Sequence, residues 1–250
     1  YVEAWLDKSG NTNNFAQTNA SKKAATEGLT LNGLNMLYFD GGDMLAGLPV
    51  WQGGDDNYSL FAVWSASRTN TAQYVFSQTK FPVLNGTRGS LILSSSGKYG
   101  FAGYNNDASS IAPYLVNEAH LTAMAVDNYA ETNITIYDSG AVYKGKTSVP
   151  GSLILGTNAC QIGADGSGAV NLSGGIAEII VFDRVLSGDE RNRVGYYLQQ
   201  KYGLSGGYTA PPETPIVDNK AGASGIGAES ATLNGELIQT GAGAAQVRVY

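Results

Sequence analysis

The alternation of apolar and polar residues along the chain predicts a mostly β protein. Short runs rich in Val, Ile, Leu and aromatic residues recur between turns built from Gly, Asn, Asp and Ser. Residues 58–65 are apolar on both faces, as in a central strand, whereas residues 133–137 alternate. Short strands separated by frequent turn signals are typical of a two-sheet sandwich or jelly roll. Strands are predicted at residues 2–6, 36–39, 58–65, 73–77, 90–93, 99–102, 120–127, 133–137, 153–155, 160–163 and 176–182.

One helix is predicted after the last of these strands. Ser187 lies three residues before Glu190, which is the spacing of a capping box. Val194, Tyr197 and Leu198 follow at helical spacing, and Gly203 stands where a left-handed C-terminal cap is expected. By contrast, residues 11–33 are polar with little periodicity and are interpreted as a long surface excursion.

Several stretches of the chain resemble one known family. The sequence GGIAEIIVFDRVLSGDERNRVGYYLQQKYGL (174–204) resembles the closing strand and helix of LamG-like, concanavalin A-like (pentraxin-type) jelly-roll domains in large secreted bacterial proteins. The segments VEAWLDKSGNTNNFAQ (2–17), NGLNMLYFDGGDMLAGL (32–48) and CQIGADGSG (160–168) resemble earlier strands and turns of that family, in the same order. The resemblance implies an all-β jelly-roll sandwich with one C-terminal helix. It implies little about function, because lectins, hydrolases and structural modules share this fold.

Composition near residue 205 indicates a boundary between domains. SGGYTAPPET (205–214) combines flexible glycines with two prolines, as in a linker. The following ESATLNGELIQTGAGAAQVRVY resembles the opening half of a fibronectin-III- or immunoglobulin-like domain, with strands expected at 215–218, 229–237 and 246–250. The expected organisation is a jelly-roll domain (1–204), a linker (205–214) and an incomplete Ig-like segment (215–250) of a larger chain. Either the natural chain continues, or these strands pair with another molecule.

Charge and cysteine content restrict the possible partners. The net charge is −6, and charged residues make up only 14% of the 250, so no basic stripe predicts nucleic-acid binding. No apolar run is long enough to predict membrane insertion. The single cysteine, Cys160, cannot form an internal disulfide and is expected in the core. A bacterial extracellular or cell-surface location fits this composition.

Catalytic groups are scarce in the sequence. His120, the only histidine, lies among strand residues and is expected to be structural. Residues 203–207 match G-x-S-x-G, but a helix precedes the serine and no histidine follows, so the match is a coincidence. Glycan hydrolases need paired carboxyl groups, yet Glu178 and Asp183 are five residues apart and should face opposite sides of a strand. We therefore expect a protein without catalytic residues, with a glycan hydrolase as the less favoured alternative.

Aromatic residues in loops are candidates for glycan recognition, because apolar sugar faces stack on rings while amides and carboxylates satisfy hydroxyl groups. Trp5 and Trp64 fall within strand patterns and are expected in the core. The alternative for each loop aromatic is a cap folded over the sandwich edge. The candidate glycan-binding residues are Trp51, Tyr104, Asn105, Asn106, Asp107 and Tyr114.

Calcium is the metal that the sequence allows, because oxygen ligands occur in several loops, although none has EF-hand spacing. No cofactor is required. The candidate calcium ligands are Asp40, Asp43, Asp55, Asp56, Asp107 and Asp165.

Together these observations predict an extracellular adhesion or glycan-binding module, whose partner is a glycan or another cell-surface polymer. The alternative is a structural subunit that binds copies of itself through exposed strands.

Overall fold

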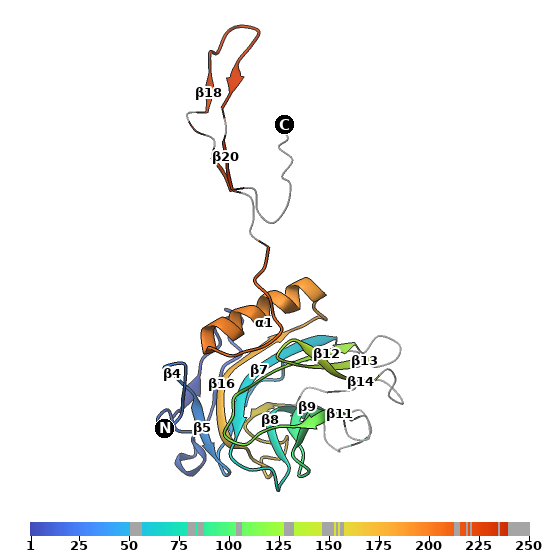
Figure 1. Ribbon diagram of the computed structural model, residues 1–250. Helices are drawn as coiled ribbons and strands as arrows, with labels where there is room; N and C mark the ends of the chain where they lie inside the picture. Colours follow the sequence, from blue (N-terminus) through green and yellow to red (C-terminus); the bar gives the residue numbers. More distant parts are fainter. Residues whose placement is uncertain are drawn as a thin grey trace. The chain divides into compact units, whose positions relative to one another are not determined.

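The computed structural model shows an all-β sandwich with one α-helix, which confirms the fold class predicted from the sequence (Figure 1). The structure describes residues 1–50, 57–79, 84, 88–103, 107–127, 133–146, 153, 155, 158–212, 216–218, 220, 222–234 and 236–239. The chain divides into two compact units, residues 1–209 and residues 210–250.

Two antiparallel sheets form the first unit. Within the described residues, one sheet has eight strands in the order β1-β2-β6-β15-β8-β9-β10-β11, and the other has six in the order β14-β13-β12-β7-β16-β5. The strands of the eight-stranded sheet are β1 (Ala4–Trp5), β2 (Phe15–Ala16), β6 (Leu45–Gly47), β8 (Gln73–Thr79), β9 (Arg88–Leu93), β10 (Lys98–Ala102), β11 (Ala108–Pro113) and β15 (Cys160–Ile162). Those of the six-stranded sheet are β5 (Leu37–Asp40), β7 (Tyr58–Ala66), β12 (His120–Asp127), β13 (Asn133–Asp138), β14 (Ala141–Lys146) and β16 (Ser173–Phe182).

Apolar side chains bury both faces of the six-stranded sheet. Its inner face packs against the eight-stranded sheet around Trp64, Phe76 and Ile176. Its outer face packs under α1 (Gly188–Tyr202) through Phe61, Leu198 and other residues (Figure 1). Burial on both faces explains why β7 is apolar at almost every position.

The helix has the caps that the sequence predicts. The Ser187 hydroxyl accepts a hydrogen bond from the backbone N–H of Glu190, and the Glu190 carboxylate accepts one from the backbone N–H of Ser187. Gly203 closes the helix with φ of 61°, in the left-handed region that glycine adopts at little cost. These reciprocal bonds confirm the predicted capping box.

Residues 204–209 remain attached to the first unit after the helix ends. Gly207 N–H donates to Ser139 O at 2.6 Å, and Asn192 exchanges hydrogen bonds with the backbone of Thr209. The ring of Tyr208 is buried against α1. The boundary between the two units therefore lies after Thr209, so the first half of the expected linker is part of the sandwich.

Two other segments depart from the predictions. The expected surface excursion at residues 11–33 contains β2, the 3-10 turn η1 (Ala20–Lys22) and β3 (Thr30–Leu31), which pairs with β4 (Leu34–Asn35) just beyond it. The ring of Phe15 anchors β2 in the core and is only 8% exposed. Of the predicted strand 153–155, the described Leu153 and Leu155 are buried but not in a strand.

The second unit consists of two short antiparallel pairs within its described residues. β17 (Ile216–Asp218) pairs with β20 (Glu236–Gln239), and β18 (Ala223–Ser224) pairs with β19 (Thr232–Leu233). The strand expected at 246–250 lies outside the described residues.

Candidate ligand-binding site

The residues predicted to bind a glycan do not form one described site. Trp51 and residues 104–106 lie outside the described residues. Tyr114 is only 2% exposed: its hydroxyl donates to Arg68 O, and its ring packs edge-on against Trp64 at 5.4 Å. The prediction that Tyr114 offers an exposed platform is therefore corrected. Asp107 accepts a hydrogen bond from Gly103 N–H at 2.8 Å.

The predicted calcium ligands are distributed over separate loops. Asp43 is buried; its carboxylate accepts the Asp40 N–H, and burial, with the nearby Asp40 charge, raises its pKa. Asp165 is also buried and accepts the backbone N–H groups of Ala169 and Val170, which shapes its own loop. In the part of the chain that the structure describes, no three acidic, histidine or cysteine side chains gather as a metal site. Asp55 and Asp56 lie outside that part.

Two of the predicted acidic residues do lie near a common neighbour. The pKa of Tyr74 is raised chiefly by burial, and the charges of Asp107 and Asp165 both add to that rise. Arg88 opposes it and donates to the Tyr74 hydroxyl at 2.8 Å. Asp107 and Asp165 thus both act on the charge of Tyr74, whose hydroxyl is already bonded to Arg88.

His120 has a packing role. Its ring stacks on Trp64 with the centroids 4.7 Å apart, and its Nε2 lies 3.1 Å from Leu115 O. Trp64 is fully buried, as predicted. This stacking on a core residue is consistent with the structural role expected for this histidine.

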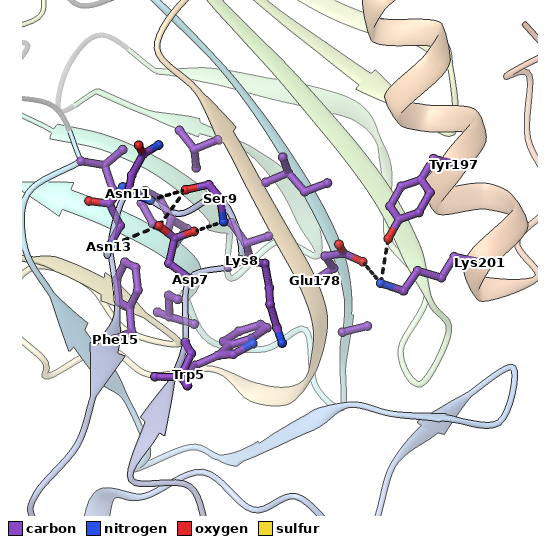
Figure 2. Close-up of a pocket in the computed structure, with 18 of the residues that line it drawn as sticks. Trp5, Asp7, Lys8, Ser9, Asn11, Asn13, Phe15, Glu178, Tyr197 and Lys201 are labelled. Atoms are coloured by element: carbon purple, nitrogen blue, oxygen red, sulfur yellow. Dashed lines mark hydrogen bonds and ion pairs between the residues drawn. The ribbon is translucent and has the colours of Figure 1, made fainter.

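A cavity of about 560 Å³ lies at one edge of the sandwich. Its walls come from the turn between β1 and β2, from the second half of β16 and from the end of α1 (Figure 2). This volume falls within the range of small-molecule sites. The lining residues are Trp5, Leu6, Asp7, Lys8, Ser9, Asn11, Asn13, Phe15, Val50, Phe76, Ile162, Ala177, Glu178, Ile179, Ile180, Val181, Tyr197, Lys201 and Tyr202.

A β-bulge in β16 shapes the wall nearest the helix. The register of β16 against β7 shifts between Ile176 and Glu178, which leaves Ala177 as an extra residue. Ile176 packs in the inner core, Ala177 packs on the helix side, and the Glu178 side chain also reaches the helix. The bulge therefore turns Glu178 away from the core, as bulges near sites often do.

At the end of the cavity nearest the helix, Glu178 is linked by hydrogen bonds to three side chains of α1, two directly and one through Lys201. Its Oε2 accepts from Lys201 Nζ at 2.8 Å, and Lys201 also donates to the Tyr197 hydroxyl (Figure 2). The same Oε2 accepts from the Tyr202 hydroxyl at 2.9 Å. Burial and the Glu178 charge raise the pKa of Tyr202. Burial disfavours the charged form of Lys201, but its hydrogen bonds to Glu178 and Tyr197 outweigh this and raise its pKa. The negative charge of Glu178 and the positive charge of Lys201 therefore neutralise each other at this end of the cavity.

The opposite wall is a turn organised by Asp7. Its Oδ1 accepts the Ser9 N–H at 2.8 Å, and its Oδ2 accepts the Ser9 hydroxyl and the Asn13 N–H (Figure 2). The bonds from Ser9 lower the pKa of the Asp7 carboxyl. Among the described residues, the side chains of Lys8, Asn11 and Asn13 have no hydrogen-bond or ionic partner. This wall therefore presents one cation and two amides for a ligand.

The remaining surface of the cavity is largely apolar. Trp5 is only partly buried, which corrects its expected place in the core, and it packs against the inner core from the cavity side. Phe15, Phe76 and Ile162 form the floor together with Ile179 and Val181. The cavity combines an aromatic ring, an apolar floor and a polar rim. Both of its carboxylates, Asp7 and Glu178, are held in structural hydrogen bonds.

Sequence reasoning missed this site for identifiable reasons. The sequence of residues 7–11, DKSGN, is typical of a turn, and its Ser and Asn residues serve a turn as well as a ligand. The one available signal was Glu178, a carboxylate within an otherwise apolar strand. A charged residue in such a strand needs a partner or a way out of the core.

Known proteins share the fold of the chain at low sequence identity. No protein-family model matches the chain, and no curated protein matches it. A Trypanosoma rangeli sialidase structure aligns with a TM-score of 0.55 at 14% identity, over 77% of this chain and 30% of the sialidase. A Ruminococcus gnavus IT-sialidase CBM40 bound to α2,3-sialyllactose aligns with a TM-score of 0.47 at 15% identity, over 62% of this chain and 92% of that one. A SAP-like pentraxin from Limulus polyphemus aligns with a TM-score of 0.44 at 12% identity, over 58% and 71%.

These likenesses concern fold alone. The chain spans less than a third of the sialidase with the TM-score of 0.55. Among the described residues, no helix is both long and apolar enough to cross a bilayer. At 14% identity the likeness to the sialidase shows a shared fold and assigns no activity.

Proposed function

We propose that the first unit is a non-catalytic module that binds a glycan in the cavity between the β1–β2 turn, β16 and α1, within a larger bacterial extracellular protein. The observation that carries this proposal is the set of polar side chains without partners, Lys8, Asn11 and Asn13, beside the partly exposed indole of Trp5. Sugars need both elements, because their apolar faces stack on rings and their hydroxyl groups need donors and acceptors.

The hydrogen bonds of the two cavity carboxylates support binding rather than hydrolysis. A glycoside hydrolase needs one carboxyl group as an acid and another as a base or nucleophile. Asp7 holds its turn, and Glu178 is tied to Lys201 and Tyr202. Each of these carboxylates therefore accepts at least two hydrogen bonds from within the protein and has a structural role. Calcium is not needed for this proposal.

The test is a binding screen of the full chain on a glycan array, followed by calorimetry with the best ligand. Trp5→Ala should weaken binding by about tenfold, because lost stacking costs about 0.5–1.5 kcal/mol beyond the lost contact area. Lys8→Ala should also weaken it, whereas Lys98→Ala, an exposed lysine on β10 outside the cavity, should not.

Three outcomes would count against the proposal. Failure of every glycan to bind, or binding unaffected by Trp5→Ala, would remove the cavity as the site. Release of reducing sugar by the wild-type protein would show a hydrolase instead. A particle mass in light scattering well above the 26.1 kDa of one chain, without glycan binding, would favour the self-associating structural subunit.

A further inference from the structure

The cavity is lined by the backbone of β16 as well as by its side chains. Five consecutive residues, 177–181, face it. Successive side chains of a strand point to opposite faces of its sheet, so consecutive residues can line one cavity only where the strand edge itself faces that cavity. One wall of the cavity is therefore an edge of the six-stranded sheet.

Among the described residues, no strand pairs with this edge along the second half of β16. β5 pairs with β16 from Ser173 to Ile176 only, whereas β16 continues along β7 as far as Phe182. In an antiparallel pair, every second residue directs its N–H and C=O away from the partner. Among the described residues, no hydrogen bond is made by the outward backbone groups of residues 178–182. The cavity thus offers peptide-like donors and acceptors in a row.

The surface beside this edge is apolar. Ile179 and Val181 point to the inner core side, where Phe15, Phe76 and Ile162 complete the floor. A ligand group that satisfies both features carries an N–H, a C=O and a small apolar end. Plain sugar hydroxyl groups do not, because they would be desolvated against the apolar floor without enough partners.

We infer that the glycan bound here carries an acetamido group. Because the N–H and C=O of a trans amide point in opposite directions, one of the two pairs with an outward backbone group of β16, and its methyl group contacts Ile179 and Val181. This inference rests on the proposed glycan-binding function. An extended peptide is the other ligand that pairs with such an edge. The sugar is favoured because the facing rim carries Trp5, Lys8, Asn11 and Asn13 rather than a second apolar strip.

The experiment is a titration of the full chain, which carries labelled isoleucine and valine methyl groups, with NMR as the detection method. N-acetylglucosamine, N-acetylgalactosamine and N-acetylmannosamine are compared with glucose, galactose and mannose. At least one N-acetylated sugar should shift the Ile179 and Val181 methyl signals at concentrations about tenfold below its parent sugar, as one net hydrogen bond together with the buried methyl group would give. Acetylated tetra-alanine amide serves as the peptide probe.

Each result decides between the possibilities. Parent sugars that bind as well as their N-acetylated counterparts would overturn this inference and leave the proposed function standing. Shifts with the peptide alone would identify strand addition and overturn both this inference and the proposed function. The absence of a shift with any of the probes would also overturn both. Ile179→Ala should reduce the preference for N-acetylated sugars, whereas Ile92→Ala, a partly buried isoleucine outside the cavity, should leave it unchanged. An unaltered preference in Ile179→Ala would place the methyl group elsewhere.

Discussion

Gly195, in the middle of α1, is where the helix and the segment that follows it meet most closely. A Cβ at this position would lie 2.3 Å from two ring carbons of Tyr208. Tyr208 is 6% exposed, and its backbone C=O accepts from the Gln199 amide. The substitution Gly195→Ala must therefore push the tyrosine ring off the helix. Residues 207–209 are expected to detach with it.

The magnitude follows from opposing contributions. Alanine is favoured over glycine inside a helix by about 1 kcal/mol. Exposure of the Tyr208 ring costs about 2–3 kcal/mol, and the hydrogen bonds of Gly207 and Tyr208 contribute about 1 kcal/mol each. Gly195→Ala should therefore lower the free energy of unfolding by about 3–4 kcal/mol. A first unit of this size should then melt roughly 6–16 °C lower.

Urea unfolding of the full chain, monitored by tryptophan fluorescence, measures this change, because all three tryptophans belong to the first unit. Gly188→Ala is the matched control: it lies in the same helix, and its nearest neighbour would be Arg191 Nη2 at 3.9 Å. That variant should be as stable as the wild type or slightly more stable. If Gly195→Ala also proved as stable as the wild type, the ring would not be packed on the helix, and the domain boundary would move back toward residue 204.

Two further predictions concern titratable groups. Hydrogen bonds from Arg184 and Ser187 lower the pKa of Glu190 to about 2 from its ordinary value of 4.5. Because the folded-state pKa is the lower one, this contribution to stability is complete above about pH 4.5. It is lost as the pH falls toward 2, so melting temperatures of Glu190→Gln should depend less on pH across that interval; an equal slope would contradict the assignment. Burial raises the pKa of the Cys160 thiol to about 12, so iodoacetamide at pH 8 should modify it only after unfolding, and mass spectrometry of the native protein should show no adduct.

Local patterns were sufficient to predict the helix and the strands of the core. Ser187, Glu190 and Gly203 act on their own neighbouring backbone groups, so their roles can be inferred from spacing alone. The both-sided burial of β7 is likewise visible as a continuous apolar run. Phe15 is a case that local patterns do not predict. This single aromatic residue anchors β2 in the core, although the residues around it in sequence are polar.

The candidate site could not be predicted in the same way because its three walls are far apart in sequence. The turn around Asp7 meets residues of β16 and α1 only after the sandwich has closed. A partly exposed tryptophan in a strand and a core tryptophan look alike in sequence, as Trp5 and Trp64 do. Loop aromatics were therefore favoured as glycan platforms. Tyr114 shows the risk of that choice, because its loop folds inward and buries the ring against Trp64.

A single inserted residue accounts for three features of the β16 wall. If β16 alternated strictly from the buried Ile176, Glu178 would point into the apolar core and Ile179 toward the helix. The bulge at Ala177 reverses this, so that Ile179 and Val181 line the inner floor while Glu178 reaches Lys201. Pairing with β5 also ends at Ile176, immediately before the bulge, and bulges commonly terminate pairing. The unpaired edge of β16, the Glu178 carboxylate that points to the helix and the apolar floor therefore have a common structural origin. A ligand that binds to this edge necessarily lies between the carboxylate and the floor.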